Sequence, residues 1–172
     1  GLRTATRKHG ALLVFDEVMT GFRVHPGGAV AAYGVAPDLV TLGKVVGGGL
    51  PAAALVGAAK YLDRLAPAGS VYQAGTLSGS PLAMAAGAAL LENLDAKAWN
   101  LAFAAATRCA HGLEEAARAA GIPLRVQQAG TMFTPFFTAE PVRSAKDLAR
   151  VDAKAYGKFF HGLLARGIYR PP

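Results

Sequence analysis

Residues 41–51 read Thr-Leu-Gly-Lys-Val-Val-Gly-Gly-Gly-Leu-Pro and contain a single charged residue, Lys44. An ammonium buried without a partner costs several kcal/mol or more, unless it loses its proton. A desolvated, neutral lysine amine is a nucleophile that can condense with an aldehyde. The glycines that follow allow the backbone to approach a flat ligand or a second chain. The same stretch is equally compatible with a surface lysine on a flexible glycine loop, and on its own it leaves both interpretations open.

Two short apolar runs precede Lys44 and predict neighbouring buried strands. Residues 11–16 form a continuous apolar run that ends in Asp16, as a buried parallel strand does. Residues 38–42 form a second run and deliver Lys44 just past its end. Ligands of open α/β sheets bind beyond the carboxyl ends of strands, so Asp16 and Lys44 could share one pocket. Asp16 could instead cap a helix or form a loop salt bridge, and we expect such a structural part for Glu17.

The remaining pattern predicts an α/β fold up to about Leu94, followed by a smaller α+β layer. We place a domain boundary near residues 96–99, which gives domains 1–96 and 97–172. Residues 19–34 are expected to be rich in loops. The other predicted elements are helices at 2–9, 58–65, 81–94, 96–120 and 144–166, and strands at 52–57, 124–128, 131–138 and from 168.

Residues 72–80 form a polar loop with small hydroxyl side chains ahead of the helix that Pro81 opens. Hydroxyl and backbone N–H groups in front of a helix suit a phosphate. Capping of that helix by the Ser80 side chain is the more ordinary explanation of the same residues.

Composition excludes several classes of function. Of the 172 residues, 52% are hydrophobic and 17% charged, which is typical of a globular protein. The net charge is +7, but the basic residues form no run, so we expect no nucleic-acid partner. We expect no membrane span, no metal site and no catalytic role for the four scattered histidines. The single cysteine, Cys109, is interpreted as a small buried hydrophobe in a reducing, cytoplasmic compartment.

Several motifs together resemble the class III pyridoxal-phosphate (PLP) aminotransferase family, in particular its aminomutase branch. They are residues 16–23 (Asp-Glu-Val-Met-Thr-Gly-Phe-Arg), 37–39, 41–51, 73–84 (Gln-Ala-Gly-Thr-Leu-Ser-Gly-Ser-Pro-Leu-Ala-Met), 132–138, 141–142 and 166–169. The similarity covers nearly the whole chain. It implies the second half of a fold type I PLP-binding large domain, over residues 1–96, and part of a small α+β domain after it.

The resemblance also implies roles for five residues. Lys44 is similar to the lysine that binds the cofactor aldehyde and later moves protons as acid and base. Asp16 is similar to the partner of the pyridinium nitrogen, and Val18 to the residue that packs on the ring. Gly75 and Thr76 are similar to phosphate binders that reach into the neighbouring subunit's site, which implies a homodimer.

The reaction implied by this branch is an intramolecular amino exchange that uses the pyridoxamine phosphate form of the cofactor. It converts a small amino aldehyde, (S)-4-amino-5-oxopentanoate, to 5-aminolevulinate for porphyrin synthesis. Two alternatives stay open: a class III aminotransferase that acts on another ω- or β-amino acid, and a non-catalytic truncated fragment.

The chain departs from the family pattern at several positions and is interpreted as a fragment. Ser80 stands where the family usually has Asn, and residues 51–57 replace a more glycine-rich version. These departures bear on the substrate more than on the cofactor. Because an upstream phosphate loop and the end of the small domain are absent from these residues, we expect the isolated chain to bind cofactor poorly and to be inactive.

Overall fold

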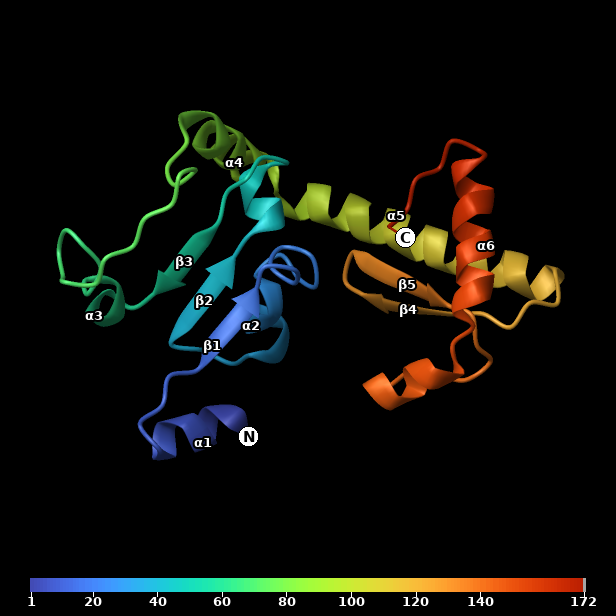
Figure 1. Ribbon diagram of the computed structural model, residues 1–172, viewed down its shortest axis with the longest axis horizontal. Coiled ribbons are helices and arrows are strands. Elements are labelled where there is room, and N and C mark those ends of the chain that lie inside the picture. Colours follow the sequence, from blue (N-terminus) through green and yellow to red (C-terminus); the bar gives the residue numbers. More distant parts are fainter. Residues whose placement is uncertain (172) are drawn as a thin grey trace. The chain divides into compact units, whose positions relative to one another are not determined.

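The computed structural model describes residues 1–171 and divides the chain into two compact units (Figure 1). The first unit is Gly1–Ala102 and the second begins at Phe103. The division falls inside the long helix α5 (Ala96–Ala119), a few residues beyond the predicted boundary. The assignment of these units to a cofactor-binding domain and a small domain stays a prediction.

A three-stranded sheet organises the first unit. Its strands are β1 (Val14–Glu17), β2 (Leu39–Leu42) and β3 (Ala54–Gly57), in the order β1-β2-β3. β1 and β2 are parallel, with Asp16 opposite Thr41, whereas β2 and β3 are antiparallel. The two apolar runs therefore form parallel neighbours, as the sequence predicts, and their carboxyl ends meet at one edge of the sheet.

The helices of this unit flank the sheet and connect its strands (Figure 1). They are α1 (Leu2–Lys8), α2 (Gly28–Tyr33), α3 (Ala59–Leu62), α4 (Pro81–Asn93) and the 3-10 turn η1 (Lys44–Gly47). α2 packs on β1, and α4 packs on η1. Residues 19–34 are rich in loops, as predicted, and the six residues of α2 are the exception.

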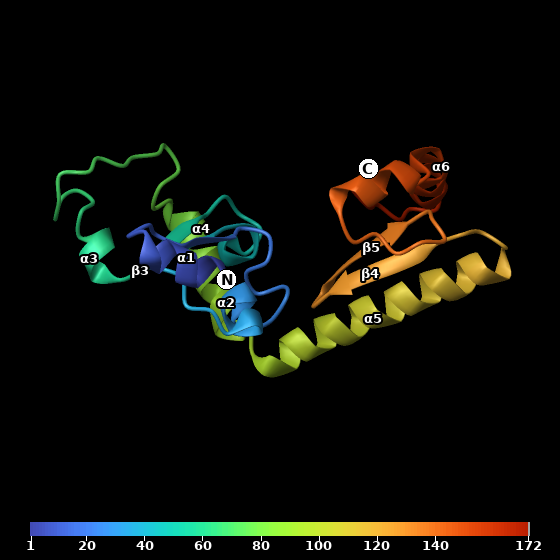
Figure 2. The same ribbon diagram turned by 90° about the horizontal axis from the view of Figure 1, so that it is seen from below.

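A β-hairpin lies between two helices in the second unit, as Figure 2 shows for α5 and α6. The hairpin consists of β4 (Arg125–Ala129) and β5 (Met132–Phe136), and the helices after it are η2 (Ala145–Arg150) and α6 (Ala153–Leu164). Gln128 donates a hydrogen bond to Thr107 of α5. Phe137 contacts the rings of Tyr156 and Phe159 on α6. One face of the hairpin is thus covered, whereas Arg125, Gln127 and Ala129 on β4 are exposed.

Two predicted elements of the second unit are wrong. The single helix expected over 144–166 is interrupted, because Val151 is extended and Asp152 starts a new helix by accepting hydrogen bonds from the N–H groups of Lys154 and Ala155. The strand expected from Ile168 is not formed within the described residues.

Burial in this chain is lower than the apolar runs predict. The β1 residue Val14 is 48% exposed, so the interpretation of the first run as a buried strand is wrong for this residue, and the β3 residue Val56 is 49% exposed. Among residues 1–171, no helix is long and apolar enough to cross a membrane.

Candidate functional site

The carboxylate of Asp16 lies at the carboxyl end of β1 and is exposed. One of its oxygens, Oδ1, accepts a hydrogen bond from the Val18 N–H at 3.0 Å and from the Thr41 hydroxyl at 3.3 Å. The parallel register explains the second contact, since it sets Thr41 directly opposite Asp16. β1 and β2 therefore hold the carboxylate in one orientation at the edge of the sheet.

Lys44 lies two residues beyond the end of β2, at the start of η1. Its side chain is exposed, so of the two interpretations that the sequence leaves open, the structure agrees with a surface lysine on a glycine-rich turn. Its backbone has φ +49°, in the left-handed region that a residue with a Cβ seldom adopts. Such conformations persist only where the surrounding structure holds them, and they cluster at functional sites.

The Val18 side chain, just after β1, packs against the backbone just after β2. A Cβ on Gly43 would lie 3.2 Å from the Val18 side chain. The glycine therefore allows the backbone just after β2 to pack against the turn that follows β1. The structure thus places Asp16, Val18 and Lys44 at one edge of the sheet. Their roles toward a cofactor stay predictions.

Gly75 and Thr76 are exposed and lie in the loop between α3 and α4. Figure 1 shows this loop running from α3 to α4. The loop contains a turn in which the Ser78 N–H donates to the Gly75 carbonyl at 2.9 Å. Ser80 is the N-cap residue of α4, but its side chain makes no capping bond, so the predicted capping role is wrong. The phosphate-binding role of Gly75 and Thr76 stays a prediction.

Glu17 faces away from Asp16 and is buried, with 2% of its surface exposed. Its carboxylate accepts hydrogen bonds from the Thr20 hydroxyl and from the N–H groups of Ala29 and Val30 at the start of α2. A Cβ on Gly28 would collide with that carboxylate, and Gly28 also has φ +65°. Glu17 therefore has the structural part that the sequence indicates.

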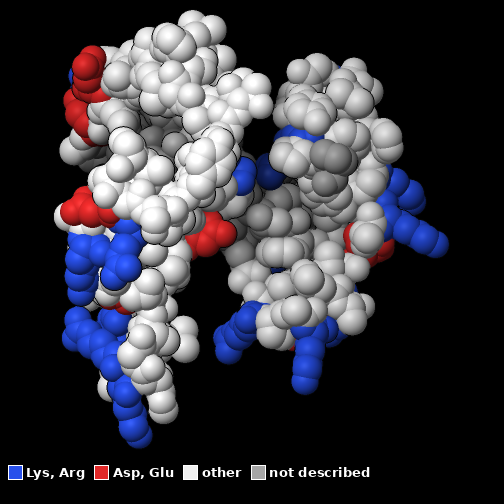
Figure 3. All heavy atoms as spheres, turned by 60° about the vertical axis from the view of Figure 1, so that its left-hand side comes forward, with Lys and Arg blue, Asp and Glu red and all other residues white. Residues whose placement is uncertain are grey.

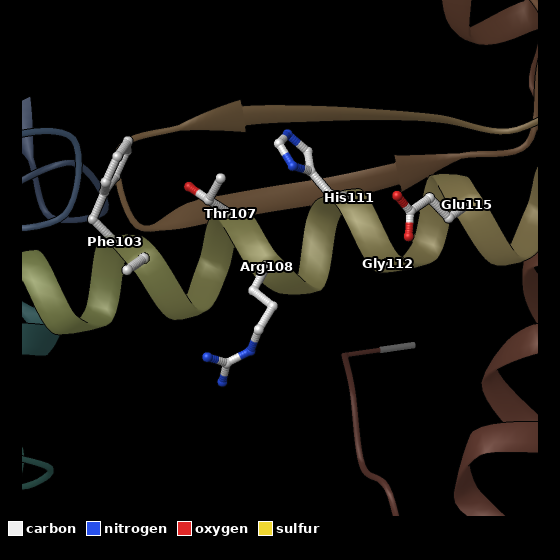
Figure 4. Close-up of a pocket in the computed structure, with 7 residues that line it drawn as sticks. Phe103, Thr107, Arg108, His111, Gly112 and Glu115 are labelled. Carbon is white, nitrogen blue, oxygen red and sulfur yellow. The ribbon is translucent and has the colours of Figure 1, made fainter.

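Each of the two units has a hollow on its surface. One, of about 210 Å³, lies on the Glu17 side of the sheet and is lined by residues that include Phe22, Val40, Leu42 and Val56. The other, of about 630 Å³, is an open groove along α5, where Thr107, His111 and Glu115 are among the lining residues (Figure 4). Neither hollow contains any of the five residues predicted for the site.

The remaining candidates contribute no cluster. Cys109 is exposed on α5, so its interpretation as a buried hydrophobe is wrong. The ring of His25 accepts a hydrogen bond from the Gly27 N–H. Over residues 1–171, no group of histidine, cysteine or acidic side chains could hold a metal ion. The basic side chains visible in Figure 3 form several separate groups.

Sequence reasoning missed Thr41 and Gly43 as parts of this edge. Thr41 orients the Asp16 carboxylate, and Gly43 lets the backbone before Lys44 pack on Val18. The signal for Thr41 was its place one residue before the end of the second apolar run. If the two runs are paired side by side and in parallel, with their carboxyl ends aligned, Thr41 lies opposite Asp16.

The fold is that of a known class of protein. The model of the family described as "Aminotransferase class-III" matches residues 1–169, and the chain belongs to this family. The mixed α/β architecture agrees with a portion of the fold type I domain of PLP-dependent transferases.

Within this family, the chain is similar to proteins whose activity is assigned. Over its whole length, the chain is 51% identical to a glutamate-1-semialdehyde 2,1-aminomutase of Anaeromyxobacter sp. (strain Fw109-5) and 55% identical to one of Roseiflexus castenholzii, in each case over 40% of the relative. A solved β-phenylalanine aminotransferase from Variovorax paradoxus superposes with a TM-score of 0.86 at 34% identity, over 99% of this chain and 40% of that one. The chain thus spans about 40% of the length of these proteins.

Proposed function

We propose that the protein to which this chain belongs is a PLP-dependent aminomutase that converts (S)-4-amino-5-oxopentanoate to 5-aminolevulinate, a precursor of porphyrins. The observation that carries this proposal is the identity of 51% and 55%, over all of this chain, to two aminomutases of that specificity. The alignment includes the edge at which Asp16, Val18 and Lys44 lie.

The residues of this edge fit the cofactor chemically. An exposed amine and an exposed, oriented carboxylate follow neighbouring parallel strands, and the apolar Val18 packs against Gly43, the residue before Lys44. When bound, PLP withdraws electrons from the substrate carbon that carries the amine. Lys44 would hold the cofactor aldehyde and move protons at the substrate carbon. Asp16 would keep the ring nitrogen protonated, because its negative charge stabilises the N–H⁺ form.

The Thr41 hydroxyl supports the role of Asp16. By donating to Oδ1 at 3.3 Å, it helps to hold the carboxylate in one orientation at the end of β1. Gly75 and Thr76 would bind the cofactor phosphate of the neighbouring subunit in a homodimer, for which their exposed loop is suited. An exposed Cys109 thiol accords with a cytoplasmic location, which we also propose.

Incubation of the full-length protein with the semialdehyde, in the absence of an amino donor, tests this function. A mutase forms 5-aminolevulinate over many turnovers, because the amine that it removes regenerates the cofactor form that it used. We expect Lys44→Ala to abolish turnover and Lys60→Ala, another exposed lysine of the same unit, to leave it unchanged. If the formation of 5-aminolevulinate stops once each enzyme molecule has made one molecule of product, the proposal is wrong.

A class III aminotransferase acting on a β-amino acid is the second candidate. It is supported by the 34% identity and TM-score of 0.86 to the β-phenylalanine aminotransferase. Such an enzyme stalls on the semialdehyde alone and resumes turnover when a β-amino acid and a keto acid are added. If Lys44→Ala changes neither cofactor binding nor turnover of any substrate, the protein is a non-catalytic relative.

A further inference from the structure

Two glycines bring the backbones of η1 and α4 into direct contact. A Cβ on Gly87 of α4 would lie 2.5 Å from the Val46 carbonyl oxygen, and a Cβ on Gly48 would lie 2.5 Å from the Ala86 carbonyl oxygen. Both distances are too short for a carbon atom in van der Waals contact with a backbone oxygen. Each element thus presents a glycine to the backbone of the other, and we call this contact the glycine contact.

The glycine contact lies immediately after Lys44. Lys44 is the first residue of η1, and its left-handed backbone would relax unless its neighbours held it. On its N-terminal side, Gly43 is packed against Val18. On its C-terminal side, the turn is closed by the Gly48 N–H, which donates to the Val45 carbonyl at 3.0 Å, and is seated on α4.

We infer that Gly87, together with Gly48, is a positioning residue for Lys44. By seating η1 on α4, the two glycines maintain the left-handed conformation of Lys44 and so set the direction in which its amine leaves the backbone. This inference rests on the role proposed for Lys44. Gly87 touches neither substrate nor cofactor, and it acts only through the backbone of residues 44–48.

The substitution Gly87→Ala in the full-length protein tests the inference directly. The matched control is Gly157→Ala, because Gly157 also lies within a helix and a Cβ there meets nothing within 4 Å. Alanine favours a helix over glycine, so the control should retain its stability. Hydrogen–deuterium exchange of the cofactor-free protein measures the conformation of residues 44–50. We expect exchange there to be about tenfold faster in Gly87→Ala, a change of one decade in the opening equilibrium.

A second readout separates positioning from packing alone. The visible absorbance of the bound cofactor titrates with pH, and its midpoint depends on how the Lys44 amine is oriented. We expect Gly87→Ala to shift that midpoint by at least about half a pH unit, which is about a threefold change in the equilibrium constant. Lower stability with an unshifted midpoint and unchanged exchange would mean that the glycine contact only packs the helix, and the inference would be wrong.

If Gly87→Ala fails to fold, a second variant that removes a carbon atom instead of adding one can test the same inference. The Ala86 Cβ lies beside Gly48, so Ala86→Gly loosens the glycine contact without adding bulk. Ala85→Gly is its control, because Ala85 is exposed on the same helix and the change has the same effect on helix propensity. We expect only Ala86→Gly to alter the exchange and the midpoint, and equal behaviour of the two variants overturns the inference. A separate experiment tests the proposed function itself: if Lys44→Ala in the full-length protein converts the semialdehyde at the wild-type rate, the proposed function is wrong.

Discussion

Adjacent residues of β1 have opposite environments, and the difference decides what each can do. Asp16 is exposed at the sheet edge, whereas Glu17 is buried and accepts three hydrogen bonds from residues 20–30. Because side chains alternate along a strand, one of two consecutive acids must face the packed side of the sheet. The buried acid holds the start of α2 in place, and the exposed acid is left for a ligand.

The substitution Glu17→Gln should destabilise the full-length protein. A glutamine offers a single carbonyl oxygen, so the N–H groups of Ala29 and Val30 would have to share one acceptor, and the charge that strengthens these bonds is lost. We expect a loss of about 1 to 3 kcal/mol in the free energy of unfolding. Urea denaturation measures this, with the exposed Glu115→Gln as control. Equal midpoints for both variants would show that the buried carboxylate contributes nothing.

Asp38 predicts a pH dependence of stability. The Leu13 N–H, at 2.7 Å, and then the Arg3 guanidinium, at 2.7 Å, lower the pKa of its carboxyl below the ordinary value. Because the folded-state pKa is depressed, the stabilisation is present above the ordinary pKa of about 4 and is lost as the pH falls through the folded-state value.

Asp38→Asn tests this dependence. We expect the variant to be less stable than the wild type at neutral pH, and the two urea midpoints to converge as the pH falls below about 4. Asp63→Asn, at an exposed aspartate of the same unit, should change the midpoint little at any pH. Parallel curves for Asp38→Asn and the wild type, down to the lowest pH, would contradict the expectation.

At this scale, the sequence could predict which residues stand at strand ends but not how they are held. Asp16 and Lys44 could be found because each directly follows an apolar run. The exposure of Lys44 could not, because burial depends on what else covers the glycine-rich turn. The glycine contact could not either, since Gly48 and Gly87 are far apart in the sequence and only the packing of α4 on η1 brings them together.

At the scale of elements, a tryptophan fixes the loop between β1 and α2. The indole N–H of Trp99 donates to the Phe22 carbonyl at 3.0 Å, and Phe22 has φ +63°. The ring of Trp99 also lies near that of His25. The first turn of α5 thereby holds the loop that follows Asp16 and Val18 in a conformation that a phenylalanine seldom adopts.

The substitution Trp99→Phe should loosen this loop while keeping most of the apolar contact. We expect a loss of about 1 kcal/mol in local stability, the usual contribution of one hydrogen bond. Limited tryptic digestion of the full-length protein measures it, because Arg23 lies within the loop. Cleavage after Arg23 should accelerate, whereas cleavage after Arg118, in α5 of the other unit, should keep its rate. Unchanged cleavage at both sites would show that the hydrogen bond does not restrain the loop.

Elements defined by local signals could be predicted, and those that depend on distant partners could not. The helices at 81–93 and 96–119 follow from Pro81 and from long helical patterns. α2 was missed because glycines occupy its N-cap position (Gly27) and its first residue (Gly28), which disfavours a helix. The helix is held instead by Glu17, on the other side of the loop that precedes it. The break before α6 had a local signal, since Ser144 with Asp147 and then Asp152 are both capping patterns.

At the scale of the whole molecule, exposed apolar surface is the main feature. Large apolar side chains lie on the surface of both units, among them Leu2, Val14, Leu55, Leu82, Leu101, Leu148 and Tyr169. Surface of this kind is usually covered by further chain or by a partner. This agrees with the 40% of their length over which the relatives are matched.

We therefore expect residues 1–172, expressed alone, to bind a hydrophobic dye and PLP differently from the full-length protein. Uncovered strands and helices should raise the fluorescence of anilinonaphthalene sulfonate several-fold, because the dye binds exposed apolar surface. The site edge of the isolated chain should bind PLP weakly, since Lys44 and Asp16 are both exposed there and water competes for them. Absorbance titration with PLP measures this, and Lys44→Ala in the full-length protein gives the baseline for cofactor held without the amine. Low dye fluorescence together with tight, Lys44-dependent PLP binding by residues 1–172 would show that these units form a complete site by themselves.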